Sequence, residues 1–325
     1  MVQAIRIHAN GGPEALSWDT ITVGEPGPGE VRVRHKAIGL NFIDVYFRSG
    51  LYPPPAPFPF IPGSEGVGIV EAVADGVSEL KVGDRVGYAG SIGSYCEARL
   101  IPADRLVPIP DTIGDSTAAA VLLKGMTARY LLRETFKVGP STTVLFHAAA
   151  GGVGLIASQW AASLGGTVIG TVGSQEKADL ALANGCAHVI NYRTEDFVAR
   201  VSEITGGRKV DVVYDSVGKD TFPGSLDCLR PRGLWVSFGQ SSGSVPPFDI
   251  GILNRKGSLF ATRPSLFGYV AERTDLLKTA ADLFATIASG AISVPEPQTF
   301  ALSDVAAAQT ALEERRTTGS VVLLP

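Results

Sequence analysis

One stretch of the chain, residues 143–154, joins an apolar run to a cluster of small residues and glycines. It reads Thr-Val-Leu-Phe-His-Ala-Ala-Ala-Gly-Gly-Val-Gly, and apolar residues at helical spacing continue to Leu164. A buried strand, a glycine turn and a helix start together form the corner that binds a dinucleotide pyrophosphate. At Gly151 and Gly152 the missing Cβ lets the backbone approach the phosphates, whose charge the helix N–H groups and dipole attract. The stretch predicts a dinucleotide site.

The match to the usual G-x-G-x-x-G pattern is incomplete, because Ala149 stands where the first glycine is expected. Gly154, the last glycine, is expected to let the helix pack close to the strand. An Ala/Gly-rich packing turn that binds no ligand would use the same residues, so this alternative stays open.

The next predicted strand, Thr167–Val172, indicates which dinucleotide the site would bind. Sites specific for NAD usually have an acidic residue at the end of this strand, where it binds the ribose hydroxyls. Here Gly173 and Ser174 follow, and Lys177 lies in the first turn of the next predicted helix. Ser174 is also a favourable N-cap for that helix, and the two roles are compatible. A missing acid and a nearby cation favour a 2′-phosphate, so NADPH is the predicted cofactor.

Composition and charge indicate an apolar globular chain of about two domains. The 325 residues are 18% charged, with a mean hydropathy of +0.20 and a net charge of −4, so no basic footprint for nucleic acid is visible. No apolar run reaches the roughly 20 residues of a membrane helix, and the first residues read as a strand without a signal-peptide pattern. The three cysteines are far apart and are expected to be buried. We expect a cytoplasmic protein without nucleic-acid or membrane partners.

The pattern along the chain changes after Pro110. Before it, short strands near residues 4–8, 31–38, 63–73, 82–86 and 93–100 predict a small barrel-like β domain. The proline-dominated segment Leu51–Pro62 cannot be a regular helix or central strand and is expected to be a stiff surface loop.

After Pro110, helices are predicted at residues 116–123 and 127–133, followed by alternating strands and helices. The six predicted strands lie at residues 143–147, 167–172, 187–191, 210–215, 233–238 and 257–262. This alternation predicts an α/β fold with a doubly wound parallel sheet. The tail is expected to return to the first domain. It has a predicted helix at about residues 272–289, a strand at 299–302, a helix through Ala311 and a strand at 321–324.

These features resemble the medium-chain dehydrogenase/reductase superfamily, and within it the zinc-free NADPH:quinone oxidoreductase branch that includes ζ-crystallin. The stretches that carry the resemblance run through the whole chain in the right order: residues 39–46, 62–68, 82–87, 146–154, 213–218, 237–243 and 263–264. The resemblance implies a GroES-like catalytic domain at residues 1–124 and 265–325, with a Rossmann domain inserted at residues 125–264. It also implies a homodimer, because dimers are common in the family.

In the zinc alcohol dehydrogenases of this superfamily, a Cys at the position of Asn41 and a His at the position of Ser64 bind catalytic zinc. Neither is present here, and Glu65 alone does not bind zinc. The cysteine-rich structural zinc lobe is also missing, and the four histidines are scattered. The sequence therefore predicts a protein that works without metal.

Chemistry without zinc restricts the substrate. Hydride transfer to an ordinary ketone needs a Lewis acid or the Tyr-x-x-x-Lys pair of the short-chain enzymes, because the product alkoxide is strongly basic. No tyrosine here has a lysine four residues later. Quinones and conjugated enones delocalise the incoming charge, so a quinone is the predicted substrate. The alternatives are an enone or alkenal double-bond reductase and, outside catalysis, an NADPH-binding structural or regulatory protein.

By the same resemblance, six residues are expected around the nicotinamide ring: Asn41, Asp44, Tyr46, Tyr52, Lys124 and Arg263. Their amide, hydroxyl and cationic donors could orient the ring and stabilise a developing oxyanion. Alternatively, the two tyrosines could pack the proline-rich loop, and Asp44 and Arg263 could form structural ion pairs. None is assigned as an obligatory proton donor, since the substrate can take its protons from water.

The resemblance also implies three groups of cofactor-binding residues. The pyrophosphate is expected at Ala150, Gly151, Gly152, Val153 and Gly154. The adenosine phosphate is expected at Gly173, Ser174, Lys177, Tyr192 and Arg315, although the adjacent Arg316 leaves that last position open by one residue. The nicotinamide half is expected at Phe238, Gly239 and Ser241.

Overall fold

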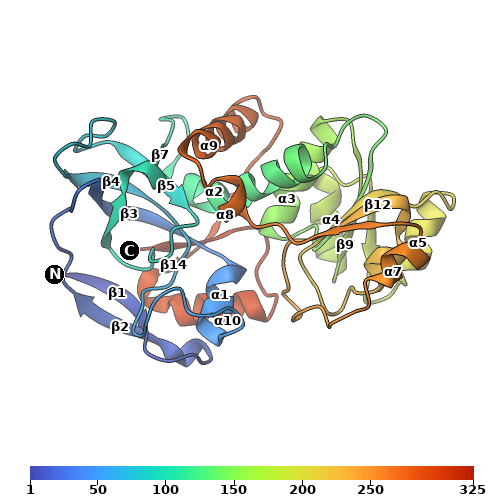
Figure 1. Ribbon diagram of the computed structural model, residues 1–325, viewed down its shortest axis with the longest axis horizontal. Helices are drawn as coiled ribbons and strands as arrows, with labels where there is room; N and C mark the ends of the chain where they lie inside the picture. The colour runs from blue at the N-terminus through green and yellow to red at the C-terminus, as the bar shows by residue number, and fades with distance from the viewer. The chain divides into compact units, whose positions relative to one another are not determined.

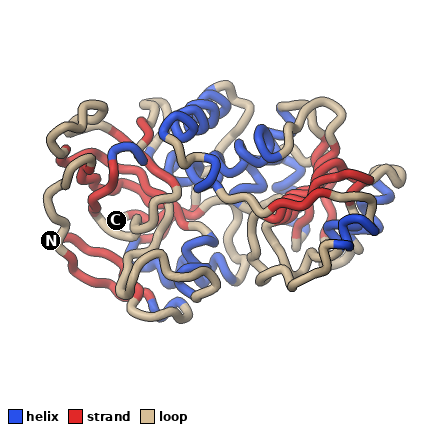
Figure 2. Tube along the Cα trace, in the orientation of Figure 1, coloured by secondary structure: helices blue, strands red, loops and turns tan.

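The computed structural model describes residues 1–325, which divide into two compact units (Figure 1, Figure 2). The first unit comprises residues 1–126, 270–281 and 294–325, and the second comprises residues 127–269 and 282–293. The first unit is therefore discontinuous in sequence. No helix combines the length and apolar character needed to cross a membrane.

A six-stranded parallel sheet forms the centre of the second unit, in the order β10–β9–β8–β11–β12–β13. Its strands are β8 (Thr143–His147), β9 (Thr167–Val172), β10 (His188–Asn191), β11 (Val210–Asp215), β12 (Leu229–Ser237) and β13 (Phe260–Thr262). This is the strand order of the doubly wound dinucleotide-binding fold. It confirms the predicted fold class, although several strands begin or end a few residues from the predicted positions.

Both faces of this sheet are covered, which explains why its strands read as continuous apolar runs. Every residue of β11 is buried, and Leu145, Ile169, Val213 and Trp235 belong to one core cluster. Helix α3 lies on one side of the sheet and α5 and α7 lie on the other (Figure 1). Between residues 152 and 269 this unit has the helices α3 (Gly152–Ser163), α4 (Gln175–Ala183), α5 (Phe197–Ile204), α6 (Gly224–Asp227), α7 (Gly251–Arg255) and α8 (Leu266–Tyr269).

A seven-stranded mixed sheet forms the first unit, in the order β14–β15–β3–β4–β5–β7, with β6 paired to β3. Its strands are β3 (Glu30–Leu40), β4 (Glu65–Val73), β5 (Arg85–Ala89), β6 (Ala98–Pro102), β7 (Val107–Pro108), β14 (Gln298–Ala301) and β15 (Val321–Leu324). A hairpin of β1 (Val2–Ile7) and β2 (Leu16–Ile21) accompanies it. Because β15 pairs with β3, the predicted return of the tail to the first β region is confirmed.

Two helical segments differ from the sequence prediction. The segment after β3, to which the pattern assigns no element, contains α1 (Phe42–Ser49), which ends at Gly50 with a φ of 80°. Residues 116–133, predicted as two helices, form one helix, α2 (Asp115–Tyr130), followed by a π-helical turn at Leu131–Thr135. Gly125 does not interrupt α2, because the surrounding residues 118–122, together with Met126, are buried, and packing outweighs intrinsic helix propensity. The last two helices are α9 (Arg273–Ala288) and α10 (Val305–Glu313).

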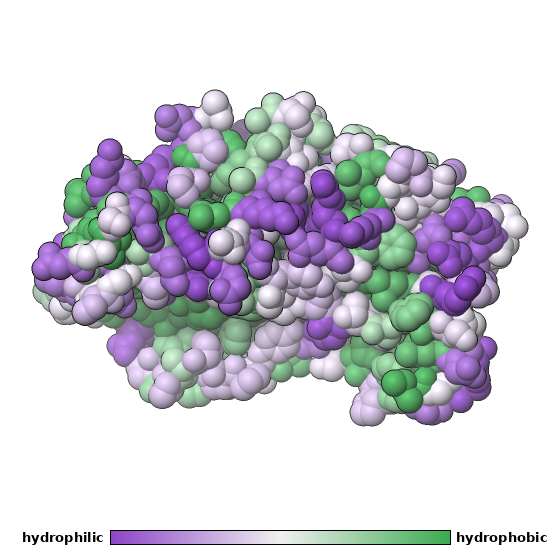
Figure 3. Space-filling model, turned by 45° about the horizontal axis from the view of Figure 1, so that its top comes forward, coloured by the Kyte–Doolittle hydropathy of each residue, from purple (hydrophilic) through white to green (hydrophobic).

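Some large apolar side chains remain on the surface. Hydrophilic side chains cover much of the face shown in Figure 3, and apolar ones gather on it at several places. Ile250 is 76% exposed and Phe260 is 60% exposed. Phe260 belongs to β13, so the edge strand of the parallel sheet presents an apolar side chain to solvent.

Candidate active site

At Gly154, the glycine turn after β8 leaves no room for a side chain. Gly151 is the N-cap of α3, and a Cβ at Gly154 would lie 2.5 Å from the carbonyl oxygen of Ala148 and 2.6 Å from that of Ala149. Helix α3 therefore packs directly on the turn, as predicted, and its free N–H groups lie at the carboxyl edge of the sheet, where such folds bind phosphates. Ala150 and Val153 belong to the same short segment.

A glycine in the neighbouring strand explains the unusual Ala149. A Cβ at Gly170 of β9 would lie 2.6 Å from the Cβ of Ala149, and the N–H of Ala149 donates to the carbonyl of Thr171 at 3.1 Å. The space that the motif usually gains from its first glycine is thus supplied by β9, so the departure from G-x-G-x-x-G keeps the turn intact.

The end of β9 forms a second corner. Ser174 caps α4 by accepting a hydrogen bond from the N–H of Lys177 at 3.3 Å, which confirms the predicted N-cap. A Cβ at Gly173 would lie 2.5 Å from the hydroxyl of Tyr192 and 3.6 Å from Nε of Arg193. Tyr192 therefore lies at this corner. Arg193, which the sequence reasoning missed, brings a second cation there, and its position directly after Tyr192 was the available signal.

The predicted nicotinamide residues form a loop after β12. Phe238 and Gly239 donate their N–H groups to the carbonyl of Asp215 at 2.8 and 3.3 Å, and the N–H of Ser241 donates to the carbonyl of Ser216 at 3.1 Å. Arg263 supports the same loop, because its guanidinium donates to the carbonyls of Ser237 at 2.8 Å and Gly239 at 3.0 Å.

In the first unit, Asn41 and Asp44 lie at the start of α1. The carboxylate of Asp44 accepts hydrogen bonds from the N–H of Asn41 at 3.0 Å, from the hydroxyl of Ser64 at 2.5 Å and from the hydroxyl of Tyr95 at 2.9 Å. Asp44, Ser64 and Tyr95 are all fully buried. Sequence reasoning missed Tyr95, which no local motif marks.

A second buried carboxylate, Glu65, connects Asn41 with Lys124. Its Oε2 accepts from the side-chain amide of Asn41 at 2.9 Å and lies 3.6 Å from the ammonium of Lys124. Its Oε1 accepts from the N–H of Leu123 at 2.7 Å, and the Lys124 ammonium also donates to the carbonyl of Leu40 at 3.3 Å. The structure thus brings Asn41 and Lys124, both predicted site residues, into one cluster with Glu65.

Burial sets the charge of both carboxylates. It raises the pKa of Asp44 to about 6, against the hydrogen bonds from Ser64, Tyr95 and Asn41, which lower it. Burial likewise raises the pKa of Glu65, while the Lys124 ammonium and the Asn41 amide act to lower it. A buried cation beside two carboxylates whose pKa values are raised makes this cluster a candidate functional site.

Tyr46 and Tyr52 pack against each other. Their ring centroids are 5.2 Å apart, and the N–H of Tyr52 donates to the carbonyl of Tyr46 at 3.0 Å. Tyr52 also contacts Phe47 edge to face at 5.8 Å, at the start of the proline-rich loop. Both interpretations of the pair, ring orientation and loop packing, fit this geometry.

Two family models match the chain. Residues 27–111 match the alcohol dehydrogenase GroES-like domain, and residues 152–286 match the model described as zinc-binding dehydrogenase. Quinone oxidoreductase of Salmonella typhimurium is 54% identical to this chain, with 100% of each covered. The chain belongs to the quinone oxidoreductase branch of the medium-chain dehydrogenase/reductase superfamily.

Further members of this family support the same assignment. The crystal structure of Escherichia coli quinone oxidoreductase complexed with NADPH has a TM-score of 0.97 and 52% identity, and the match covers 99% of this chain and 100% of that one. The 2-haloacrylate reductase of Burkholderia sp is 47% identical, with 100% of this chain and 99% of that protein covered. The predicted resemblance is therefore confirmed.

At the positions where zinc-dependent relatives bind the metal, this family member has side chains that bind each other. The amide of Asn41 is bonded to Glu65 and the hydroxyl of Ser64 to Asp44. An amide and a hydroxyl are not the thiolate and imidazole ligands that zinc prefers. Nowhere in the chain do three His, Cys, Asp or Glu residues gather as a candidate metal site. Buried His35 and His147 each bond to protein partners instead.

The predicted site residues fall into two sets. Asn41, Asp44, Tyr46, Tyr52, Lys124 and Arg315 belong to the first unit, and all the others belong to the second. Arg315 follows α10 with a φ of 59°, and its N–H donates to the carbonyl of Leu312 at 3.1 Å.

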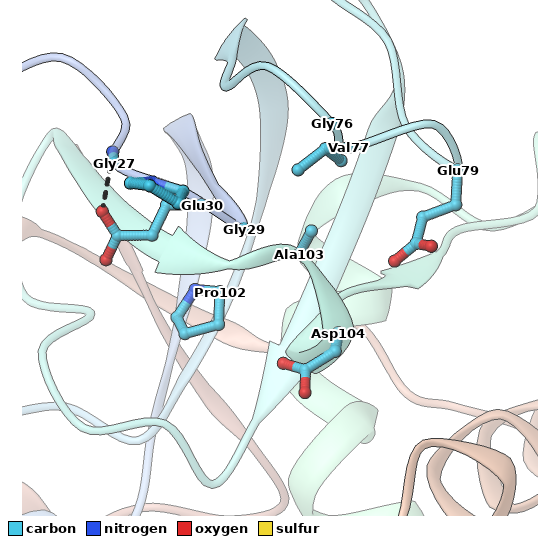
Figure 4. Close-up of a pocket in the computed structure, with 10 residues that line it drawn as sticks. Gly27, Gly29, Glu30, Gly76, Val77, Glu79, Pro102, Ala103 and Asp104 are labelled. Atoms are coloured by element: carbon cyan, nitrogen blue, oxygen red, sulfur yellow. Dashed lines mark hydrogen bonds between the residues drawn. The ribbon is translucent and has the colours of Figure 1, made fainter.

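A surface hollow elsewhere in the first unit contains none of the predicted residues. It has a volume of about 610 Å³ and lies between the loops around Gly27, Val77 and Ala103 (Figure 4). Its polar lining is acidic, from Glu30, Glu79 and Asp104, and Glu30 accepts a hydrogen bond from the N–H of Gly27 at 3.1 Å. Carboxylates would repel the phosphates of a dinucleotide, so this hollow is not the cofactor site.

Proposed function

We propose that this protein is an NADPH-dependent quinone reductase. The observation that carries the proposal is the 54% identity to a quinone oxidoreductase along the full length of both chains. The geometry of the two units supports it, because the second unit has the turn and corner of a dinucleotide site and the first has a buried cluster of donors. We assign reaction chemistry to residues 1–124 and 265–325 and cofactor binding to residues 125–264.

The cofactor would be held along the carboxyl edge of the parallel sheet. The free N–H groups of the 150–154 turn would bind the pyrophosphate, where any Cβ at Gly154 would collide with the backbone. The corner at Gly173, Ser174 and Lys177, with Tyr192 and Arg193 beside it, would bind the 2′-phosphate. Phe238, Gly239 and Ser241 would contact the nicotinamide half. When bound, NADPH supplies the hydride for the reduction.

The first unit would orient and stabilise the acceptor. Glu65 and the carbonyl of Leu40 hold the Lys124 ammonium in place, and a fixed cation stabilises the negative charge that develops on a reduced quinone oxygen. Asn41 is held by Glu65 and by the Asp44 carboxylate. The hydroxyls of Tyr46 and Tyr52 would orient the acceptor ring. In the second unit, the guanidinium of Arg263, which supports the loop after β12, would orient the nicotinamide ring. Protons would come from water.

We also propose that the protein is a homodimer that acts in the cytoplasm. The edge strand β13 has unpaired backbone groups on its outer side and an exposed Phe260, and such an edge favours pairing with a second copy. Sedimentation of Phe260→Lys tests this arrangement, and an unchanged dimer would exclude the β13 edge as its interface.

The cytoplasmic location is supported by the cysteines. All three are buried free thiols, which suits a reducing compartment.

A substrate panel tests the proposed activity. Consumption of NADPH should be measured with simple quinones, a 2-haloacrylate, conjugated enones, aliphatic ketones and primary alcohols. We expect turnover with quinones and little with ketones or alcohols. The similarity to 2-haloacrylate reductase makes an activated alkene the second candidate acceptor. Efficient alcohol oxidation would contradict the proposal, and NADPH binding without turnover of any acceptor would favour a non-catalytic role.

Metal dependence is tested on the same preparation. Because Asn41 and Ser64 are bonded to the two carboxylates, we expect no stoichiometric metal by elemental analysis and an unchanged quinone rate with a chelator. Loss of activity on chelation, restored by zinc, would overturn this part of the proposal.

A further inference from the structure

The carboxylate of Asp215, at the end of β11, is a buried hub of hydrogen bonds. Asp215 is fully buried, and its two oxygens accept from backbone, hydroxyl and indole groups. The donors are the N–H groups of Val217 at 2.9 Å and Gly218 at 3.1 Å, Ser225 Oγ at 2.8 Å, Trp235 Nε1 at 3.2 Å, and Thr221 Oγ1 at 2.9 and 2.8 Å from the two oxygens. So many donors keep a buried carboxylate ionised and fixed in place.

The hub holds two loops together at the carboxyl edge of the sheet. Asp215 fixes residues 216–218 through its side chain and receives the N–H groups of Phe238 and Gly239 on its own carbonyl. The two loops then bond to each other through their backbones. The N–H of Ser242 donates to the carbonyl of Val217 at 2.9 Å, and the N–H of Lys219 donates to the carbonyl of Gly243 at 3.1 Å. A Cβ at Gly239 would lie 2.8 Å from the carbonyl oxygen of Ser216, so the loops are in direct contact.

The same hub reaches the glycine turn through a histidine. Ser225 bridges Asp215 to Nε2 of His147 at 3.1 Å, and Nδ1 of His147 lies 2.9 Å from the hydroxyl of Thr171. His147 is the last residue of β8, directly before the turn. Ser, His and Asp are the residue types of a hydrolytic triad, but here the fully buried serine lies between the other two and cannot act as a nucleophile.

We infer that Asp215 is a positioning residue, which holds the loop at residues 238–243 in the geometry that binds the nicotinamide half of the cofactor. The inference rests on the proposed NADPH site. Asp215 does not itself contact the cofactor in this scheme, and its effect passes through the carbonyl and side-chain bonds to the two loops. Loss of the hub should weaken binding of the nicotinamide half and spare the adenosine half, whose corner lies at the ends of β9 and β10.

Calorimetric titration of the full chain with NADPH and with 2′,5′-ADP, which lacks the nicotinamide half, tests this inference. Thr221→Val keeps the side-chain shape and removes the hydroxyl that both Asp215 oxygens accept. We expect it to weaken NADPH about five- to tenfold and to change 2′,5′-ADP by less than about twofold. Thr221→Ser should restore NADPH binding, and Asp215→Asn should weaken it further, because an amide NH₂ would face other donors.

Thr286→Val is the matched control, because its hydroxyl bonds only within α9, to the carbonyl of Asp282 at 2.7 Å. It should bind both ligands like the wild type. Unchanged NADPH affinity in Thr221→Val, or equal weakening of both ligands, would overturn the inference, and this variant decides the matter if Asp215→Asn does not fold. A wild type that does not bind NADPH would instead contradict the proposed function.

Discussion

Each unit buries an aspartate beside its proposed site, and the pKa values of the two carboxylates shift in opposite directions. Asp215 accepts from backbone N–H groups, hydroxyls and an indole, and although burial acts to raise its pKa, His147 and these hydrogen bonds outweigh burial and lower the pKa. Asp44 is also fully buried, but there burial prevails over its hydrogen bonds and raises the pKa to about 6. Donor supply, not burial alone, therefore decides which carboxylate is a fixed anion and which changes its protonation near neutral pH.

The cluster of Asn41, Glu65 and Lys124 depends on a single cation in a way that the Asp215 hub does not. Lys124 is buried, lies 3.6 Å from Glu65 and acts to lower the pKa of both Glu65 and Asp44. Lys124→Met would leave Glu65 buried without its partner, so we expect the free energy of unfolding at pH 7.5 to fall by about 3–5 kcal/mol in urea denaturation.

Two variants sharpen this result. Adding Glu65→Gln to Lys124→Met should recover part of the loss, because it removes the uncompensated charge. Lys256→Met is the matched control, since its partner Asp227 is 37% exposed, and it should cost less than about 1 kcal/mol. A loss below about 1 kcal/mol in Lys124→Met would show that Glu65 does not need its cation.

In the second unit, by contrast, the two cations at the end of β9 are not buried: Lys177 is half-buried and Arg193 is exposed. Lys177→Ala should weaken NADPH about ten- to a hundredfold and barely change NADH, because a charge-assisted bond to the 2′-phosphate is lost. Arg193→Ala should act in the same direction with a smaller effect, since this side chain is exposed. Calorimetry with both dinucleotides measures this, with Arg208→Ala as the control. Equal affinity of the wild type for NADH and NADPH would contradict the cofactor assignment.

The two aspartates should also differ in how stability depends on pH. The folded-state pKa of Asp44 is raised, so its stabilising contribution is present at low pH and is lost as pH rises through about 6. Relative to Asp44→Asn, the wild type should lose about 2 kcal/mol of unfolding free energy between pH 4.5 and 7.5.

Asp215 provides the contrast in the same measurement. Its pKa is lowered, so its contribution is present above the ordinary carboxylate pKa and is lost only as pH falls through the folded value. The difference between the wild type and Asp215→Asn should therefore stay flat from pH 4.5 to 7.5. If the difference in unfolding free energy between the wild type and Asp44→Asn followed the same pH dependence as that between the wild type and Asp215→Asn, the proposed contrast between the two aspartates would be wrong.

Features that depend on neighbouring residues could be predicted from the sequence. Short local patterns predicted the β8 strand with its glycine turn, the Ser174 cap and the alternating strands of the parallel sheet. Helix α1 was missed even though Asn41 and Asp44 have the spacing of a helix start. That signal was available, and the polar and aromatic composition of the segment concealed it.

The buried clusters could not be predicted, because they join residues that are far apart in the chain. Glu65 meets Asn41 from 24 residues away and Leu123 from 58, and Lys124 reaches the carbonyl of Leu40 across 84 residues. Tyr95 and Ser225 carry no motif of their own. Their roles follow from strand order and crossover geometry, which periodicity does not specify. The roles of the site residues themselves remain predictions for the experiments above.

The smallest effects are expected where hydroxyls only orient the acceptor. Tyr46 and Tyr52 support each other through ring contact at 5.2 Å, a contact that phenylalanine preserves. Tyr46→Phe and Tyr52→Phe should therefore each lower kcat/KM for a simple quinone by less than about tenfold, the value of one neutral hydrogen bond. The control is Tyr269→Phe, because the hydroxyl of Tyr269 lies 2.9 Å from that of Thr135 and outside the predicted site. Complete loss of quinone turnover in Tyr52→Phe with NADPH binding intact would identify that hydroxyl as an acid catalyst, because orientation alone cannot account for so large an effect.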